Sequence, residues 1–297
     1  MKKNEAKSKK ATAVATDAPA VEKETAAAAE QPAKAEEPAE TAKGEMNDDP
    51  AAVPVTFLVM LTSVDNDCFL LRHCLRSLEK NLRGVNANVK VVGKEKPQWL
   101  DDNSWLDVAD DADTQNWNAI IMRAATLVEV ERIVIMSDRM SLLRPVTLAD
   151  IALLKAEVGA NGNQTVHLLR DWQGSKVKVH NYRTNMPAMF FKSTLIPVLD
   201  FVMNSKGVAD FDLPTAYFNL IYAELMPVLL EWTTDSWLLP VISENPDMER
   251  VRTYWLKKKF LYISDRYGKD IIAWLKFMTP DPSKAEKLLG NEDPAEN

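Results

Sequence analysis

The sequence predicts an α/β protein with a mainly parallel sheet, and three patterns near its start carry that prediction. The segment Val53–Leu61 is a long apolar run, which is typical of a strand buried on both faces of a sheet. In residues 68–82 apolar side chains recur at helical spacing, and Arg72 and Arg76 lie off that stripe. Residues 86–93 read as a second strand, which closes a strand–helix–strand unit.

Further strands and helices continue the alternation. Residues 114–128 are expected to form a helix capped by Thr114, and Ile133–Met136 is short and apolar, as expected of a third buried strand. An α/β fold follows from this order, and its ligands would lie at the carboxyl ends of the parallel strands. Downstream we expect helices over 145–157, 193–204, 214–226 and 247–277, and strands over 165–170, 175–182, 186–191, 228–232 and 237–241.

Composition divides the chain into an arm over residues 1–52, a folded domain over 53–278 and a polar tail over 279–297. The arm is rich in Ala, Glu, Lys and Pro and contains no aromatic residue, Ile or Leu, so we expect it to be disordered. It could bind a protein partner, touch nucleic acid or simply keep the protein soluble. The lysines that would make a nucleic-acid contact are Lys2, Lys3, Lys7, Lys9 and Lys10.

Composition also narrows the class of protein. The chain has 297 residues, a net charge of −7 and nine glycines, and it contains no glycine-rich phosphate loop, which argues against Rossmann-type NAD binding and P-loop chemistry. No apolar run is long enough to span a bilayer, and no apolar segment follows the first lysines. With two cysteines in one helical segment, we expect a cytoplasmic protein with reduced thiols.

Polar residues follow the first predicted strand in the loop that leads to the helix. Asp65 or Asp67 could accept a hydrogen bond from a ribose hydroxyl or a base NH at the crevice outside the sheet. Alternatively, Asp67 caps the helix that follows it. The two roles remain open on the sequence alone.

Asp138 and Arg139 follow the third predicted strand. A carboxylate there could hold a metal or orient a sugar, but Mg²⁺ or Mn²⁺ normally needs two or more oxygen ligands, and Arg139 would repel a cation. We therefore predict no metal ligands, while leaving a bound Mn²⁺ or Mg²⁺ open. Arg139 could instead pair with a phosphate, and the alternative is a surface Asp–Arg turn.

Two later segments carry further candidates. His180, Arg183 and Asn185 lie close together in the sequence, and His180 could act as a base or could be an edge residue of a strand. Asp212 precedes a predicted helix, on which Thr215 and Asn219 share a face. Capping of that helix explains Asp212 equally well.

Taken together, several stretches resemble GT-A-like glycosyltransferases of the bacterial and phage capsule-type group. The resemblance implies a GT-A-like (Rossmann-like) three-layer sandwich with C-terminal helices, over roughly residues 54–235. In that group the third strand usually ends in two adjacent acids, and here Arg139 replaces the second; Asn185 stands where the group often has a His. The matching stretches are Arg72–Leu78, Val91–Leu100, Ile135–Pro145, Asn181–Pro187 and Asp212–Asn219.

The resemblance further implies that Asp65 contacts the nucleotide, Asp138 the diphosphate-sugar and Asp212 the acceptor. On this interpretation Asp67, Arg139 and Asn185 add to the nucleotide-sugar site, and His180 or Asp212 supplies the catalytic base. The chain would transfer a sugar from a nucleotide sugar to a glycan or another hydroxyl acceptor, without needing a metal. The alternative is a non-catalytic binding or structural protein on the same fold, such as a phage or mobile-element component.

Overall fold

A computed structural model of the chain describes residues 53–62, 66–108, 116–159, 162–174, 177–230, 237–264 and 266–287. The predicted arm, the candidate Asp65, the expected cap Thr114 and the end of the predicted tail from residue 288 lie outside the described residues. None of the helices that the structure describes is both long enough and apolar enough to cross a bilayer.

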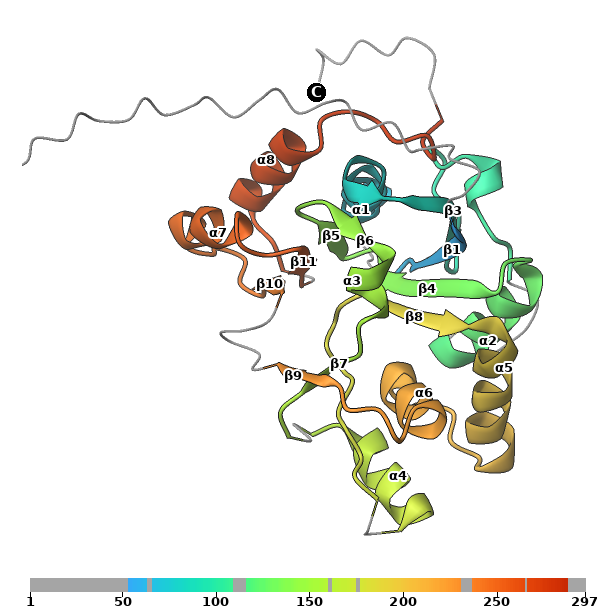
Figure 1. Ribbon diagram of the computed structural model, residues 1–297. Helices are drawn as coiled ribbons and strands as arrows, with labels where there is room; N and C mark the ends of the chain where they lie inside the picture. Colours follow the sequence, from blue (N-terminus) through green and yellow to red (C-terminus); the bar gives the residue numbers. More distant parts are fainter. Residues whose placement is uncertain are drawn as a thin grey trace, which may run out of the picture. The chain divides into compact units, whose positions relative to one another are not determined.

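A four-stranded sheet in the order β3-β1-β4-β8 confirms the α/β fold class (Figure 1). Strand β1 (Val53–Met60) lies between β3 (Val85–Val92) and β4 (Arg132–Ser137) and is parallel to both, while β8 (Ala188–Phe191) is antiparallel to β4. Strands β1, β3 and β4 are the first three strands expected from the sequence. Their parallel pairing brings the carboxyl ends of β1 and β4 together.

Helices cover both faces of this sheet, as Figure 1 shows. Alternate residues of β1 face opposite sides: Phe57 packs in the cluster that contains α1 (Phe69–Asn81), and Leu58 packs in the cluster of the opposite face. Both side chains are fully buried, which explains why this strand is apolar throughout. The helices of the opposite face are α2 (Trp117–Leu127), α5 (Lys192–Asp200) and α6 (Leu213–Ile221).

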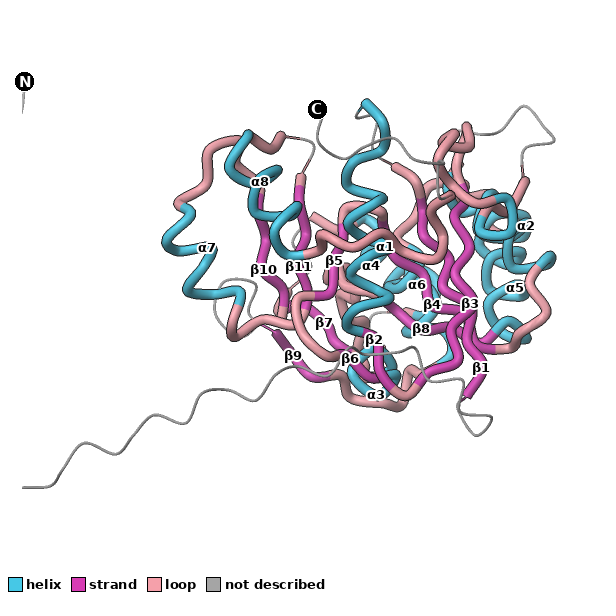
Figure 2. The backbone as a smooth tube through the Cα atoms, turned by 90° about the horizontal axis from the view of Figure 1, so that it is seen from above, coloured by secondary structure: helices cyan, strands magenta, loops and turns pink. Residues whose placement is uncertain are grey.

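A second, three-stranded sheet lies beside α1 and corrects one prediction. Residues 247–277 were expected to be helical, but they form α7 (Met248–Trp255), β11 (Phe260–Ile263) and α8 (Lys269–Met278). Phe260 and Leu261, on opposite faces of β11, are both fully buried, and burial on two faces favours a strand. Figure 2 shows β11 between its partners, which are β5 (Met140–Leu142, antiparallel) and β10 (Leu238–Val241, parallel).

The part of the chain between β5 and β8 differs most from the predictions. The helix expected over 145–157 is short: α3 (Leu148–Ala152) is flanked by β6 (Val146–Thr147) and β7 (Lys155–Glu157). Residues 165–170 belong to a helix, α4 (Gln164–Gln173), rather than a strand. The remaining short elements are β2 (Leu82–Arg83), β9 (Val228–Leu230), the 3-10 turns Asn66–Cys68 and Asp102–Ser104, and the π-helical turn Phe201–Ser205.

A local cap explains why α4 is a helix. The side chain of Asn163 accepts a hydrogen bond from the backbone amide of Thr165, and Val166 and Leu169 bury one face of the helix. The strand expected over 175–182 is also wrong for the described part of that segment, where Asn181 makes only an isolated antiparallel bridge with Glu157. This extended, non-strand segment lines the site described below.

The first part of the predicted tail, up to Lys287, packs against α1. Glu286 is buried and forms two hydrogen bonds with Arg76, of 2.7 and 2.8 Å, while Arg72 lies 3.4 Å from it. Burial alone would raise the pKa of Glu286, but the bonds from Arg76 and from the Ser283 amide lower it overall. This ion-pair cluster holds the segment against α1, so the first part of the predicted tail is part of the fold.

Candidate functional site

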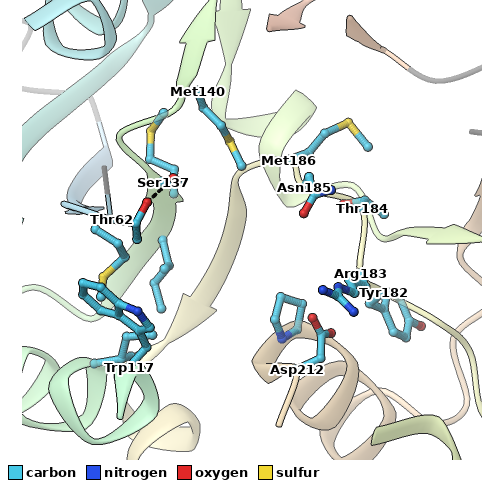
Figure 3. A pocket seen from close by; sticks show the side chains of 15 residues that line it. Thr62, Trp117, Ser137, Met140, Tyr182, Arg183, Thr184, Asn185, Met186 and Asp212 are labelled. Atoms are coloured by element: carbon cyan, nitrogen blue, oxygen red, sulfur yellow. Dashed lines mark hydrogen bonds between the residues drawn. The ribbon is translucent and has the colours of Figure 1, made fainter. Parts of the chain in front are cut away.

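A cavity of about 250 Å³ lies where β1 and β4 end (Figure 3). Met60 is the last residue of β1, Thr62 lies two residues beyond it, and Ser137 is the last residue of β4. All three line the cavity. Because β1 and β4 are neighbouring parallel strands, this is the edge of the sheet at which α/β proteins bind ligands.

One part of the cavity wall is apolar. The half-buried indole of Trp117, in the first turn of α2, faces the cavity beside Ile121 of the same helix. Methionines contribute much of the rest, and their flexible thioethers suit an adaptable contact with a flat or irregular ligand. The other apolar lining residues are Met60, Ile135, Met136, Met140, Tyr182, Met186 and Pro214.

The opposite wall is polar and comes from two loops. Arg183, Thr184 and Asn185 precede β8, and Asp212 precedes α6. Figure 3 shows these four residues across the cavity from Thr62, Ser137 and Trp117. Asn185 is exposed and has a φ of 47°, a left-handed backbone conformation that an L residue other than glycine adopts infrequently. Of the sequence candidates, Asn185 and Asp212 therefore do line the cavity.

A network of buried polar side chains supports that wall. Asn219 on α6 accepts a hydrogen bond of 2.9 Å from the His180 amide and donates one of 2.8 Å to the His180 carbonyl. One turn earlier, the Thr215 hydroxyl accepts from the Tyr182 amide and from the side chain of Asn163, each at 3.0 Å. These bonds tie the segment before Arg183 to α6 and to the start of α4, so the position of Arg183 depends on three separate segments.

Asp212 is held by the same network. Its side chain caps α6 by accepting a hydrogen bond of 2.9 Å from the Thr215 amide, and its own amide donates to the Thr165 hydroxyl at 2.8 Å. Only Oδ1 makes that cap; Oδ2 makes no hydrogen bond with a residue that the structure describes. The capping interpretation of Asp212 is thus confirmed, and the cap leaves one carboxylate oxygen available at the cavity.

Asp138 has a different role from the one expected. Its side chain is fully buried and does not line the cavity. Oδ1 accepts hydrogen bonds from the Thr62 amide at 3.1 Å, the Thr62 hydroxyl at 2.7 Å and the Ser137 hydroxyl at 3.1 Å. Because residues alternate along β4, Ser137 faces the cavity and Asp138 points toward α1. It joins the ends of two strands, so this geometry gives no support to the predicted contact with a diphosphate-sugar, which stays a prediction.

Neither Arg139 nor Asp67 lines the cavity. Arg139 is half-buried, and its Nη2 donates to the Thr62 carbonyl at 3.3 Å. Asp67 is exposed and forms an ion pair of 3.0 Å with Arg72. The expectation that Asp67 caps α1 is also wrong, because the N-cap position is occupied by Cys68 and has no side-chain cap.

His180 lies behind the polar wall. Its ring is nearly buried, packs edge-on against Tyr182 and lines no cavity that contains Asp212. Burial, and secondly the charge of Lys178, lower the pKa of His180. The structure therefore separates the two residues that the sequence suggested as a base, and leaves Asp212 at the cavity.

The residues that line the cavity do not fit a hard divalent cation. Asp212 is the one carboxylate among them, Asp138 is buried and already accepts three hydrogen bonds, and Arg183 places a guanidinium nearby. Within the described part of the chain, no group of three or more His, Cys, Asp or Glu side chains could hold a metal ion.

The sequence analysis missed most of the cavity wall. Neither Trp117 nor the methionines were among its candidates. Thr62 and Ser137 could have been found, because each stands at the carboxyl end of a predicted parallel strand. No protein-family model and no curated protein matches this chain.

Proposed function

We propose that the chain binds a nucleotide sugar in this cavity and transfers the sugar to a hydroxyl acceptor, as a GT-A-like glycosyltransferase that uses no metal. The observation that carries the proposal is the position and lining of the cavity. It lies at the carboxyl ends of neighbouring parallel strands and has an indole on one wall and a guanidinium beside a carboxylate on the other.

Each wall suits one part of such a donor. A base or sugar ring can stack on Trp117, while Arg183 can form charge-assisted hydrogen bonds with the diphosphate. The volume of about 250 Å³ is below the usual range for a whole drug-sized ligand, so the enclosed part holds one moiety and the rest extends along the polar rim.

The carboxylate of Asp212 supplies the proton acceptor in this proposal. Its Oδ2 takes the proton from the acceptor hydroxyl as the acceptor oxygen bonds to the anomeric carbon. The bond from that carbon to the diphosphate breaks, and the diphosphate leaves with its negative charge stabilised by Arg183. The cap from Thr215 holds the carboxylate in place, which is the preorganisation that such a base needs.

One observation favours the second candidate, a binding protein without catalysis. Asp138 is buried beneath Thr62, so a metal-binding pair of carboxylates at the end of β4 is not formed by the described residues. A protein of this kind would bind the nucleotide sugar in the same cavity and would release it unchanged. Binding and turnover must therefore be measured separately.

Calorimetric titration of the full chain with UDP-, GDP-, CDP- and dTDP-sugars, in the presence of EDTA, tests the binding step. We expect one of them to bind, and Trp117→Ala to weaken it about tenfold, since a stacked ring contributes about 1–3 kcal/mol. Trp255→Ala is the matched control, because Trp255 is also half-buried but lies on α7, away from the cavity. Absence of binding by all four classes would refute the proposal; binding without turnover would favour the second candidate.

A further inference from the structure

A second cavity, of about 340 Å³, adjoins the first. It is formed by the start of α4 and by the residues that precede α6. Arg183 and Asp212 line both cavities, so the two spaces meet at these side chains. The other residues that line the second cavity are Gly162, Asn163, Gln164, Thr165, Asp210 and Phe211.

The lining of this second cavity contrasts with the first. Apart from Gly162 and the nearly buried Phe211, every residue that lines it carries a polar side chain. Asn163 and Thr165 are buried, and their side chains are hydrogen-bonded to other residues of the wall. They therefore hold the cavity in shape and are not available to a ligand. The exposed side chains of Gln164, Asp210 and Arg183, and the second oxygen of Asp212, remain for a ligand.

This set of groups selects a class of ligand. Two carboxylates can accept hydrogen bonds from sugar hydroxyls, a guanidinium can donate to them, and an amide can do both. Two carboxylates against one guanidinium give the cavity a negative balance, which disfavours uronic acids and sugar phosphates. An apolar alcohol would displace water from these groups without replacing its hydrogen bonds and is disfavoured for that reason.

We propose that the second cavity is the acceptor subsite and that it binds a neutral or amino sugar. The inference rests on the proposed function, because Asp212 at the junction would take the proton from the hydroxyl of this sugar. The donor would occupy the apolar cavity and the acceptor the polar one, with the reacting atoms between Arg183 and Asp212.

Saturation-transfer NMR of the full chain with glucose, galactose, glucosamine and glucuronate tests the subsite without requiring turnover. We expect glucose, galactose or glucosamine to bind and glucuronate to bind more weakly. Asp210→Asn and Gln164→Ala should each weaken saccharide binding about fivefold, the effect of one lost hydrogen bond, and leave the affinity for the nucleotide sugar unchanged. Both residues line only the polar cavity. Asp171→Asn is the control, because Asp171 is exposed on α4 but lines neither cavity.

Failure of this inference is distinguishable from failure of the proposed function. If a nucleotide sugar binds but no saccharide does, or if both variants bind saccharide as tightly as the wild type, the acceptor subsite is refuted. Stronger binding of glucuronate than of glucose would refute the preference for neutral and amino sugars. If a saccharide binds in the predicted way but no nucleotide sugar does, the subsite stands as a sugar-binding site and the transferase proposal falls.

Discussion

The chain contains two Asp–Arg pairs near the carboxyl edge of its main sheet, and they have opposite roles. Asp138 and Arg139 are neighbours in the sequence at the end of β4, yet neither lines the cavity. Asp212 and Arg183 come from different loops, yet they meet in space and line two cavities. The first pair could be recognised because its residues are adjacent in the sequence, whereas the second pair is brought together only by the fold.

Burial accounts for the difference between the two carboxylates. Asp138 is fully buried, and Oδ1 accepts three hydrogen bonds, so its charge is used to hold the strand ends. The pKa of Cys74 on α1 is raised, first by burial and then by the charge of Asp138, which places that charge on the α1 side of the sheet. Asp212 is half-buried and commits one oxygen to a helix cap. A carboxylate can therefore be equally well ordered in both places and be chemically available in only one.

The largest expected effect is that of Asp212→Asn on catalysis. Asparagine caps a helix about as well as aspartate, so the free energy of unfolding should change by less than about 0.5 kcal/mol. The substitution removes the proposed proton acceptor, so the rate of sugar transfer should fall about 10²–10⁴-fold. Initial-rate measurements and urea unfolding of the same preparation check both statements. Wild-type turnover in this variant would break the comparison, because Asp212 would then be only a cap.

Asp138→Ala should show the converse, a loss of stability. Removing this carboxylate leaves the amide and the hydroxyl of Thr62 without their acceptor, and we expect the free energy of unfolding to fall by about 2–3 kcal/mol. Asp138→Asn keeps an acceptor oxygen and is the matched variant, with a smaller loss. Urea unfolding measures both. Stability equal to that of the wild type in Asp138→Ala would show that the strand ends do not depend on this side chain.

The main sheet, and the strand ends that lie at the cavity, were accessible from the sequence. Strands buried on both faces must be apolar throughout, so β1 and the centre of β4 could be predicted from single segments. Their shared carboxyl edge follows from parallel pairing and locates Thr62 and Ser137. Asp212 could be found as a cap before a helix, although its second role depends on what lies next to it.

Arg183, Asn185 and Asp212 of the polar wall were candidates from the sequence, but their assembly into one wall could not be predicted, because no local pattern brings their segments together. The Thr165–Arg170 segment begins with β-branched residues, which favoured a strand, but the cap from Asn163 and the burial of Val166 and Leu169 against α6 decide for a helix. Arg183 is positioned by Asn219 and Thr215, which are distant in sequence. Such a network becomes visible only when α4, α6 and the segment before β8 are packed together.

The two arginines give a third, smaller contrast. Arg183→Ala should weaken binding of the nucleotide sugar about five- to tenfold, because an exposed guanidinium loses a charge-assisted contact worth about 1 kcal/mol. Arg139→Ala should change that affinity by less than about twofold, since Arg139 lines neither cavity. Titrations at two salt concentrations would show the screening expected for Arg183. A larger effect from Arg139 than from Arg183 would reverse the assignment of the two pairs.

The smallest expected effect is that of His180→Gln on the transfer reaction. The Asn219 side chain holds His180 through its backbone, so the wall should persist without the imidazole, and the rate should stay within about threefold of the wild type. The pKa of His180 is lower in the folded protein than its value of 6.5 in the unfolded chain. The neutral ring therefore favours the folded state above pH 6.5, and this contribution to stability is lost as the pH falls below 6.5. Glutamine does not titrate, so the variant should lose less stability than the wild type below pH 6.5. If the pH–rate profile of the variant loses its acidic limb, His180 is the base after all, and the separation of the two candidate bases drawn from the cavity geometry is wrong.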